Sequence, residues 1–180
     1  MKVLCILTNG FEEIEAIGSI AILRRGGVDL DIFSLHNTTS TGRYGVTIAN
    51  LNDIKNLQLD KYEALLIPGG PQYAELEANT YFLKIIKEFN NKQKLIAAIC
   101  AGPTILGHLG LLKNKQYTCF KSMNEDFGGE YIDTYAVKSG NIITGISAAA
   151  TIDFAFLFLE ALTSKEHAEH IKNQIYYYSK

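Results

Sequence analysis

Cys100 has the sequence neighbours of a reactive residue. It follows an apolar run at 95–99, LIAAI, of the kind that forms a strand buried on both faces. Residues 101–104 then open a helix, whose first turn tolerates Pro103 because no intrahelical partner awaits its missing N–H. A cysteine on a sharp turn between strand and helix has the arrangement of a nucleophile elbow. The positive end of the helix favours the thiolate, so the sequence predicts a nucleophilic Cys100 with a depressed pKa.

Cys100 has a second interpretation as a small buried hydrophobe, because free cysteines are often inert core residues. The small side chains of Ala98 and Ala101, with Gly102, leave room for a sharp turn and favour the nucleophile. The stretch alone leaves both interpretations open.

Length and composition restrict the class of protein. The 180 residues suffice for one domain, at 1–180, with a sizeable core. The net charge is −2 and the charges are mixed along the chain, so nothing predicts a nucleic acid or an anionic membrane as partner. The apolar runs at 3–7 and 154–159 are too short for a signal peptide and a membrane span, respectively.

The cysteines do not form a recognisable framework. Cys5, Cys100 and Cys119 are an odd number at wide spacings, which argues against structural disulfides. With four scattered histidines they show no zinc-binding spacing. We therefore expect neither a metal nor another cofactor, and a reducing cytoplasmic compartment.

Strands and helices alternate along the chain. The pattern predicts strands at 2–8, 29–34, 46–49, 64–67, 95–99, 117–120, 136–138 and 142–145, and helices at 13–25, 80–90, from 101 onward, 151–162 and 165–178. The first strand, helix and strand form a βαβ unit, which implies a parallel sheet with a right-handed crossover. The expected fold class is an α/β sandwich with a mainly parallel sheet.

The first predicted helix, at 13–25, is apolar around more than one face. Its apolar residues are Ile14, Ile17, Ile20, Ala21, Ile22 and Leu23. One sheet contact cannot bury them all, so this helix is expected to pack on a second copy of the chain in a homodimer.

Three loops leave strands at the edge of the sheet where ligands bind in such folds, the carboxyl ends of the strands. They are residues 9–15, 68–70 and 100–102. Together they bring a thiol, carboxylates and a glycine turn to one place.

Motifs in those loops resemble the ThiJ/PfpI superfamily, which includes the parkinsonism-associated deglycase branch. They are GFEEIE at 10–15, IPGG at 67–70 and AAICAGPT at 97–104, and the similar layout covers nearly the whole chain. The resemblance implies a flavodoxin-like three-layer sandwich, usually a homodimer. It also implies that Cys100 is the reactive cysteine and Glu15 its carboxylic partner.

The resemblance further places the backbone N–H groups of Gly70 and Ala101 at an oxyanion pocket, with Gly69, Cys119 and Phe120 among its lining. Because a thiolate and a carboxylate side by side repel, one of them holds a proton, and a protonated Glu15 can donate a hydrogen bond to the sulfur. The residues alone do not choose among the three glutamates of 10–15. Glu12 and Glu13 are interpreted as solvated residues of the first helical turn.

Two departures from the family pattern affect the chemistry. Peptidase-type members carry a histidine after the cysteine, where this chain has Ala101, and glyoxalase- and deglycase-type members carry a site histidine that aligns at Phe120. Residues 146–150 replace an Arg/Gly/Pro-containing loop of the deglycase branch. His108 lies about 12 Å along the helix from Cys100, too far to reach the sulfur.

Three functions remain. The first, slightly favoured, is a cysteine-dependent enzyme of glyoxalase or deglycase type that acts on a small-molecule carbonyl substrate, weakened by the missing histidine. The second is a non-enzymatic stress protein that responds to an oxidant through Cys100. The third, a cysteine peptidase, is least favoured because no histidine is placed to pair with the thiol.

Overall fold

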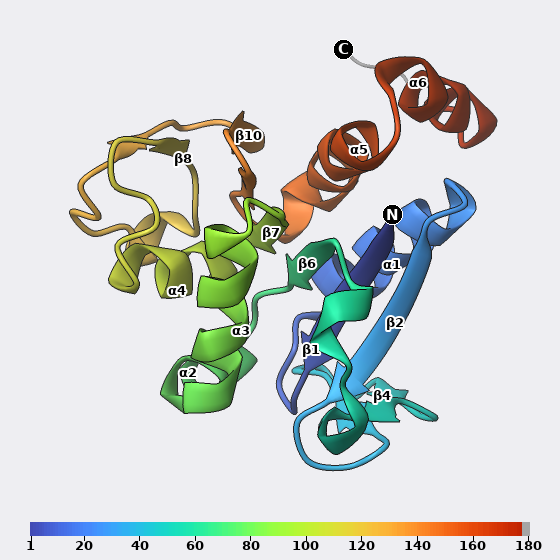
Figure 1. Ribbon diagram of the computed structural model, residues 1–180. Helices are drawn as coiled ribbons and strands as arrows, with labels where there is room; N and C mark the ends of the chain where they lie inside the picture. The colour runs from blue at the N-terminus through green and yellow to red at the C-terminus, as the bar shows by residue number, and fades with distance from the viewer. Residues whose placement is uncertain (178–180) are drawn as a thin grey trace.

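The computed structural model describes residues 1–177 and is built around a seven-stranded sheet. The sheet order is β10-β11-β7-β6-β1-β2-β5, and every neighbouring pair is parallel except β10 with β11. The strands are β1 (Lys2–Leu7), β2 (Asp29–Ser34), β5 (Asn52–Asp53), β6 (Ala64–Ile67), β7 (Leu95–Ile99), β10 (Ala136–Ser139) and β11 (Ile142–Gly145). The predicted mainly parallel sheet is confirmed (Figure 1).

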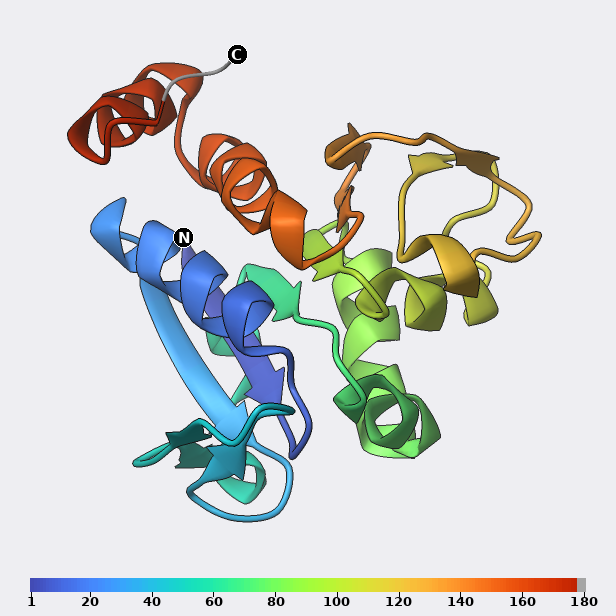
Figure 2. The same ribbon diagram turned by 180° about the vertical axis from the view of Figure 1, so that it is seen from behind.

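Helices cover both faces of this sheet. One face carries α1 (Ser19–Arg25), α5 (Thr151–Leu162) and α6 (Lys165–Gln174), and the other carries α2 (Gln72–Ala78), α3 (Thr80–Asn91) and α4 (Gly102–His108), as Figures 1 and 2 show. Side chains of β1 alternate between the two cores: Val3 and Cys5 face the α1–α5 layer, whereas Leu4 and Ile6 face the α3–α4 layer. The fold is therefore the expected three-layer α/β sandwich.

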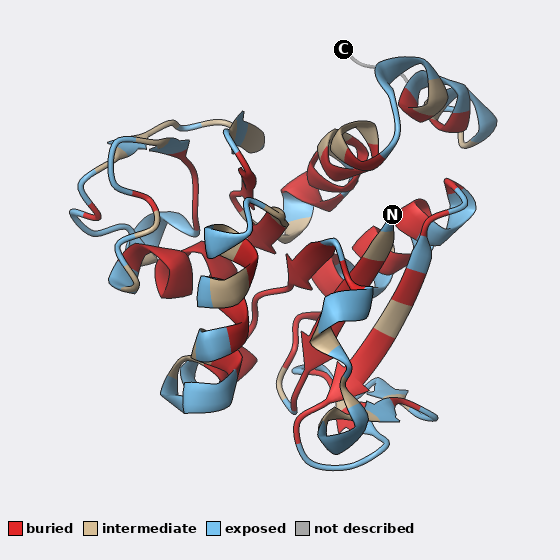
Figure 3. Ribbon diagram, in the orientation of Figure 1, coloured by how far each residue is buried: buried red, intermediate tan, exposed pale blue. Residues whose placement is uncertain are grey.

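The central strands are the most deeply buried part of the molecule (Figure 3). Along β7, the side chains from Ile96 to Ile99 are all fully buried, as expected for a strand covered on both faces. The helices begin where the sequence predicts: the side chain of Asn79 accepts a hydrogen bond from Phe82 N at the start of α3, and Ser164 accepts one from His167 N at the start of α6. These caps fix the helix boundaries.

The first predicted helix is not α-helical throughout. It opens as a π-helical turn, η1 (Ile14–Gly18), and becomes α1 only at Ser19. Gly18 lies against α5 so closely that a Cβ there would be 2.9 Å from Thr151 Cγ2. A π turn, which is common at functional sites, sets the direction of Glu15 within this segment.

Short strands differ from the predictions. Residues 46–49 do not extend the main sheet: β4 (Thr47–Ile48) pairs with β3 (Ser40–Thr41) in a separate hairpin, and β5 forms the edge. The strand expected at 117–120 is only β8 (Gln116–Tyr117), paired with β9 (Glu130–Tyr131). Sequence patterns could not assign such two-residue strands, because their pairing depends on distant segments.

Two helices differ from the prediction. Helix α2 was not expected, since the sequence at 72–78 has too little apolar periodicity over so short a run. Helix α6 ends at Gln174, before the predicted 178, and Tyr178 lies outside the described residues. That residues 1–180 form one domain stays a prediction.

Candidate active site

Cys100 lies on a strained turn between β7 and α4. Its φ is 63°, in the left-handed region that non-glycine residues seldom adopt. Hydrogen bonds hold this conformation on both sides, because Cys100 N donates to Gly145 O at 2.9 Å and Phe120 N donates to Cys100 O at 2.9 Å. The turn has the predicted geometry of a nucleophile elbow.

Glu15 reaches the thiol from the η1 turn. Its side chain is fully buried, and its carboxyl lies close enough to the Cys100 thiol for each group to shift the pKa of the other. Gly69 N donates to Glu15 Oε2 at 2.9 Å, whereas Oε1 has no hydrogen-bond partner within residues 1–177. Glu15 is therefore brought to Cys100, as the motif resemblance implied.

The glycine turn after β6 completes the arrangement. A Cβ at Gly69 would lie 2.7 Å from Glu15 Oε2 and 2.8 Å from Cys100 Cβ, so only glycine fits between the two side chains. Gly70 has a φ of +86°, and the N–H groups of Gly70 and Ala101 lie close enough to the Cys100 sulfur to oppose the rise of its pKa. The N–H groups expected at an oxyanion pocket thus converge on the thiol.

Burial dominates the protonation of this pair. Burial raises the pKa of Glu15 to about 7, while the hydrogen bonds from Cys100 and Gly69 oppose the rise. Burial also raises the pKa of Cys100, and the Glu15 carboxylate raises it further against the Ala101 and Gly70 N–H groups. Because each negative charge opposes the other, the two groups do not both ionise at neutral pH.

The predicted depressed thiol pKa is therefore wrong: burial, and then the Glu15 charge, raise the pKa of Cys100. The sequence argument counted the helix N-terminus but not the loss of water around the sulfur, which is the larger effect here.

A cleft with a cavity volume of about 660 Å³ opens over the sulfur. It is lined by Glu12, Glu15, Arg43, Tyr44, Gly70, Pro71, Tyr73, Ala74, Cys100, Ala101, Phe120, Met123, Ser147 and Ala148. The structure places Phe120 in this lining, with its side chain 43% exposed. Gly69 lies behind the cleft, between Glu15 and Cys100, and does not line it.

Cys119 was expected in the pocket, and that prediction is wrong. Its side chain is fully buried in the core of the α3–α4 face, and its sulfur lies 3.8 Å from Asn124 Oδ1. The backbone reverses direction after Cys119, so adjacent residues point to opposite sides: Phe120 to the cleft and Cys119 to the core.

The solvated roles expected for Glu12 and Glu13 are also wrong, because both side chains are buried. Glu12 Oε2 accepts a hydrogen bond from Glu15 N at 2.8 Å, and Glu13 Oε1 accepts one from Tyr44 N at 2.7 Å. Loop residues 41–46 fold back over this segment and cover it. That contact joins distant parts of the chain, so helical position alone could not reveal it.

Sequence reasoning missed several lining residues, above all Arg43, Tyr44 and Ser147. A usable signal existed for the first two, because they lie in the loop that leaves β2 at its carboxyl end, where ligands bind in such sheets. No histidine is among the described residues that line the cleft.

Comparison with known proteins agrees with the motifs. A family model described as the DJ-1/PfpI family matches residues 1–161. The chain belongs to the DJ-1/PfpI family. The resemblance stated from the three motifs is thereby confirmed.

Relatives of the family span most of the chain. An uncharacterised protein of Methanocaldococcus jannaschii is 32% identical over 173 residues, 92% of this chain and 82% of its own length. A protein of Pyrococcus horikoshii named a deglycase is 29% identical over 147 residues, 80% of this chain and 89% of its own. The crystal structure of Drosophila melanogaster DJ-1beta has a TM-score of 0.91 and 27% identity, covering 99% of this chain and 98% of its own.

Other site types have little support in the described part of the chain. Within residues 1–177, histidine, cysteine, aspartate and glutamate form no group of three or more that could hold a metal ion. None of the helices there is long and apolar enough to cross a membrane.

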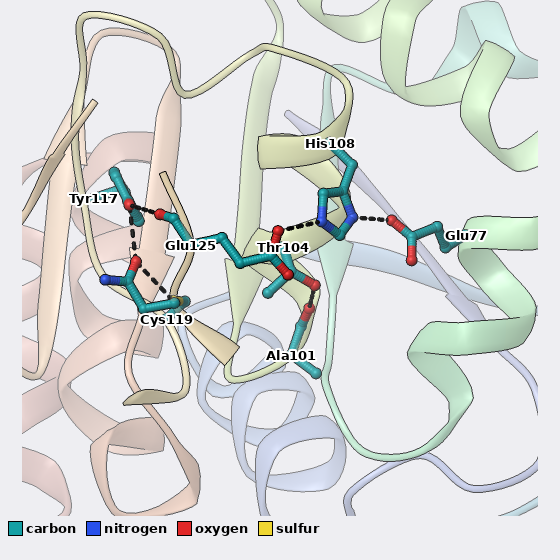
Figure 4. Close-up of polar contacts among 8 residues, drawn as sticks. Glu77, Ala101, Thr104, His108, Tyr117, Cys119 and Glu125 are labelled. Atoms are coloured by element: carbon teal, nitrogen blue, oxygen red, sulfur yellow. Dashed lines mark hydrogen bonds and ion pairs between the residues drawn. The ribbon is translucent and has the colours of Figure 1, made fainter. Parts of the chain in front are cut away.

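His108 joins the two walls of the cleft. It pairs through Nδ1 with Glu77 of α2, the helix that contributes Tyr73, and through Nε2 at 3.3 Å with Glu125, near Met123 of the opposite wall. Figure 4 shows the imidazole between the two carboxylates. The hydrogen bond to Glu77 raises the pKa of His108, and the one to Glu125 adds to the rise against partial burial.

The His108 bridge should make stability depend on pH. Because its folded pKa is raised, the stabilisation is complete below the unfolded value of about 6.5 and is lost as pH rises through the folded pKa. Wild type should exceed His108→Gln in free energy of unfolding more at about pH 5.5 than at about pH 8.5. The gap should stay below about 1 kcal/mol because the ring is partly exposed.

Urea unfolding at both pH values measures this difference, with His170→Gln as the control, since within residues 1–177 the His170 side chain pairs only with that of Gln174. Glu15 titrates in every variant and cancels. An equal gap at both pH values would show that His108 contributes packing rather than charge.

The length of the residue at position 15 should control the thiol. Glu15→Gln retains the reach and an N–H donor, so Cys100 alkylation between about pH 6 and 8 should stay within about threefold of wild type. Glu15→Asp retracts the carboxyl by one methylene and should slow alkylation by about tenfold. Peptide mass analysis reads Cys100, with buried Cys5 and Cys119 as internal controls. If Asp preserves the rate and Gln abolishes it, the charge and not the reach governs the site.

Proposed function

We propose that this protein of the DJ-1/PfpI family is a cysteine-dependent enzyme that acts on small carbonyl compounds. The observation that carries the proposal is the close approach of the buried Glu15 carboxyl and Cys100, on either side of Gly69, beneath a cleft open to small molecules. The deglycase names of relatives from Pyrococcus horikoshii and Thermococcus kodakarensis support the same class of chemistry.

The reaction begins when the Cys100 thiolate attacks the carbonyl carbon. The carbon–sulfur bond forms, and the π electrons of the C=O bond move to the oxygen. The N–H groups of Gly70 and Ala101 stabilise that oxyanion, and the proton on Glu15 passes to it to give a hemithioacetal. One proton thus serves both steps: it passes from the Cys100 sulfur to Glu15 before the attack, and from Glu15 to the former carbonyl oxygen after it.

A 2-oxoaldehyde can be carried further without an outside oxidant. The Glu15 carboxylate removes the proton from the former aldehyde carbon, whose electron pair forms a C=C bond while the neighbouring carbonyl oxygen gains a proton, which gives an enediol. Glu15 then returns the proton to the second carbon, and the hydroxyl on the first carbon loses its proton as the C=O bond of the thioester forms. The first carbon is oxidised and the second reduced, which leaves a thioester of Cys100. Water then cleaves the carbon–sulfur bond, releases a 2-hydroxy acid and restores the thiol.

A non-enzymatic response to oxidants is the second candidate. Cys100 is partly exposed whereas Cys5 and Cys119 are fully buried, so an oxidant meets Cys100 first. The Gly70 and Ala101 N–H groups could hold the oxygens of a sulfinate. A cysteine peptidase is not favoured, since no imidazole lines the described cleft.

Turnover of methylglyoxal separates the first two candidates. We expect slow formation of a 2-hydroxy acid by wild type, and a loss of at least about 100-fold in Cys100→Ser, which lacks the thiolate. The product is measured directly by chromatography, so simple trapping of the aldehyde by thiols does not count as turnover. Equal rates in both proteins would refute the enzyme and leave the redox role.

Phe120→His should raise that turnover. The side chain of Phe120 lines the cleft beside Cys100, and a positioned imidazole contributes roughly 10²–10⁴-fold as acid or base. We expect a gain of about tenfold, with the peroxide sensitivity of Cys100 little altered, since oxidation needs only an accessible thiolate. Kinetics and mass detection of sulfinate on both proteins provide the readouts. A fall in turnover would mean that Glu15 alone handles the protons.

The likeness to the family also supports a homodimer through the first helix, in a reducing cytoplasm that keeps the three cysteines free. Ile20 and Leu23 are buried within the chain, whereas Ile14 is 60% exposed and Ile17 39% exposed on the η1 turn. These two side chains form the apolar surface available to a second copy.

Ile17→Lys should therefore shift the protein from dimer to monomer. A charged side chain at that contact cannot be desolvated without a large cost. Light scattering at micromolar concentration measures the mass, with Tyr81→Lys as the control because Tyr81 is exposed on α3, on the other side of the sheet. A wild-type monomer, or an equal shift in both variants, would contradict a dimer through this helix.

A further inference from the structure

We propose that Arg43 forms an anion-recognition subsite in the Cys100 cleft, which selects carbonyl compounds that also carry a carboxylate. The preference for an anion stands on the geometry of Arg43, and the carbonyl part rests on the proposed function. The preferred substrate class is accordingly a short oxoaldehyde with an acidic group at its far end.

Arg43 is the one cation among the described residues that line the cleft. Its guanidinium lies 5.5 Å from the centre of the Tyr44 ring and forms no ion pair within residues 1–177. The carboxylates in the same cleft are already engaged: Glu12 accepts from Glu15 N, and Glu15 accepts from Gly69 N. The hydrogen-bonding fork of Arg43 is therefore open to a ligand.

The turn that carries Arg43 is pinned to the segment that carries Glu15. Arg43 N donates to Phe11 O at 2.8 Å, and buried Glu13 Oε1 accepts from Tyr44 N at 2.7 Å and from Val46 N at 3.3 Å. Gly42 faces the Glu13 carboxyl so closely that a Cβ there would lie 2.5 Å from Cδ. Glu13 thus acts as a positioning residue for the turn.

This construction fixes where the two ends of a ligand must lie. Glu15 and the backbone partner of Arg43 belong to one stretch, 11–15, so the backbone of Arg43 is held beside the segment that carries Glu15. A carbonyl group bound at Cys100 leaves the remainder of a short molecule along the cleft toward Arg43. A guanidinium binds a carboxylate through two parallel hydrogen bonds, which makes that group the matching end.

A pair of matched alkylating agents tests the subsite without requiring turnover. Iodoacetate and iodoacetamide both form a carbon–sulfur bond to Cys100 and release iodide, but only iodoacetate carries a carboxylate. Arg43→Met should lower the ratio of the iodoacetate rate to the iodoacetamide rate by about tenfold, with the iodoacetamide rate within about twofold of wild type. Constancy of the neutral reagent shows that the thiol and the fold are intact.

Arg25→Met is the matched control, because it removes the same charge from an exposed residue at the end of α1, outside the lining of the cleft. Its rate ratio should equal that of wild type. An unchanged ratio in Arg43→Met, or an equal fall in both variants, would overturn the subsite and assign any effect to net charge.

A second measurement addresses the substrate itself. Methylglyoxal and 4,5-dioxopentanoate share the 2-oxoaldehyde group, but the latter has a carboxylate two methylenes away. Wild type should favour 4,5-dioxopentanoate in kcat/KM, and Arg43→Met should lose about tenfold on it while keeping its methylglyoxal rate. If neither compound turns over but the alkylation ratio still falls in Arg43→Met, the proposed function fails and the anion subsite stands.

Discussion

The buried contact between Glu15 and Cys100 is the constraint on which the rest of the structure depends. Two acids in one buried space cannot both ionise readily, because each charge lacks water and repels the other. Backbone N–H groups stabilise the charged form of each group. Gly69 N donates to the Glu15 carboxylate, and the N–H groups of Gly70 and Ala101 oppose the rise in the pKa of Cys100. A site balanced in this way keeps a nucleophile and its proton source in contact at neutral pH, with no imidazole beside them.

Such a contact requires three chain segments to meet almost without space between them. The close approach explains why Gly69 has no side chain, and why Gly102 is small: a Cβ there would lie 2.7 Å from Ile67 O of β6. It also explains the strained φ of Cys100, which hydrogen bonds to Gly145 and Phe120 hold in place. Strain at the nucleophile is thus balanced by the parallel sheet beneath it, whose strands β6, β7 and β11 end at this point.

Local patterns in the sequence predict much of this structure, because period-2 and period-3.6 burial follow from strands and helices that cover one another. The elbow at Cys100 is equally local, since strand, turn and helix lie within ten residues. The failures at Cys119, Glu12 and Glu13 are non-local: each depends on which distant loop covers the residue. The thiol pKa failed for a related reason, because the helix N-terminus can be read from the sequence whereas the loss of solvent around the sulfur cannot.

The three glutamates of the first loop divide the work of building one site. Glu15 is the carboxylic partner of Cys100. Glu12 accepts a hydrogen bond from Glu15 N and so fixes the backbone of Glu15, and Glu13 holds the turn that carries Arg43. Three carboxyl groups so close to a thiol would repel every anionic ligand if the cleft held no cation. Glu13 holds the turn that carries the Arg43 guanidinium, and this positive charge offsets the field of the carboxyl groups locally, so the acidity around Cys100 does not exclude an acidic substrate. The motif at 10–15 therefore supplies the carboxylic partner of the nucleophile and also anchors the turn that carries the cation of the cleft.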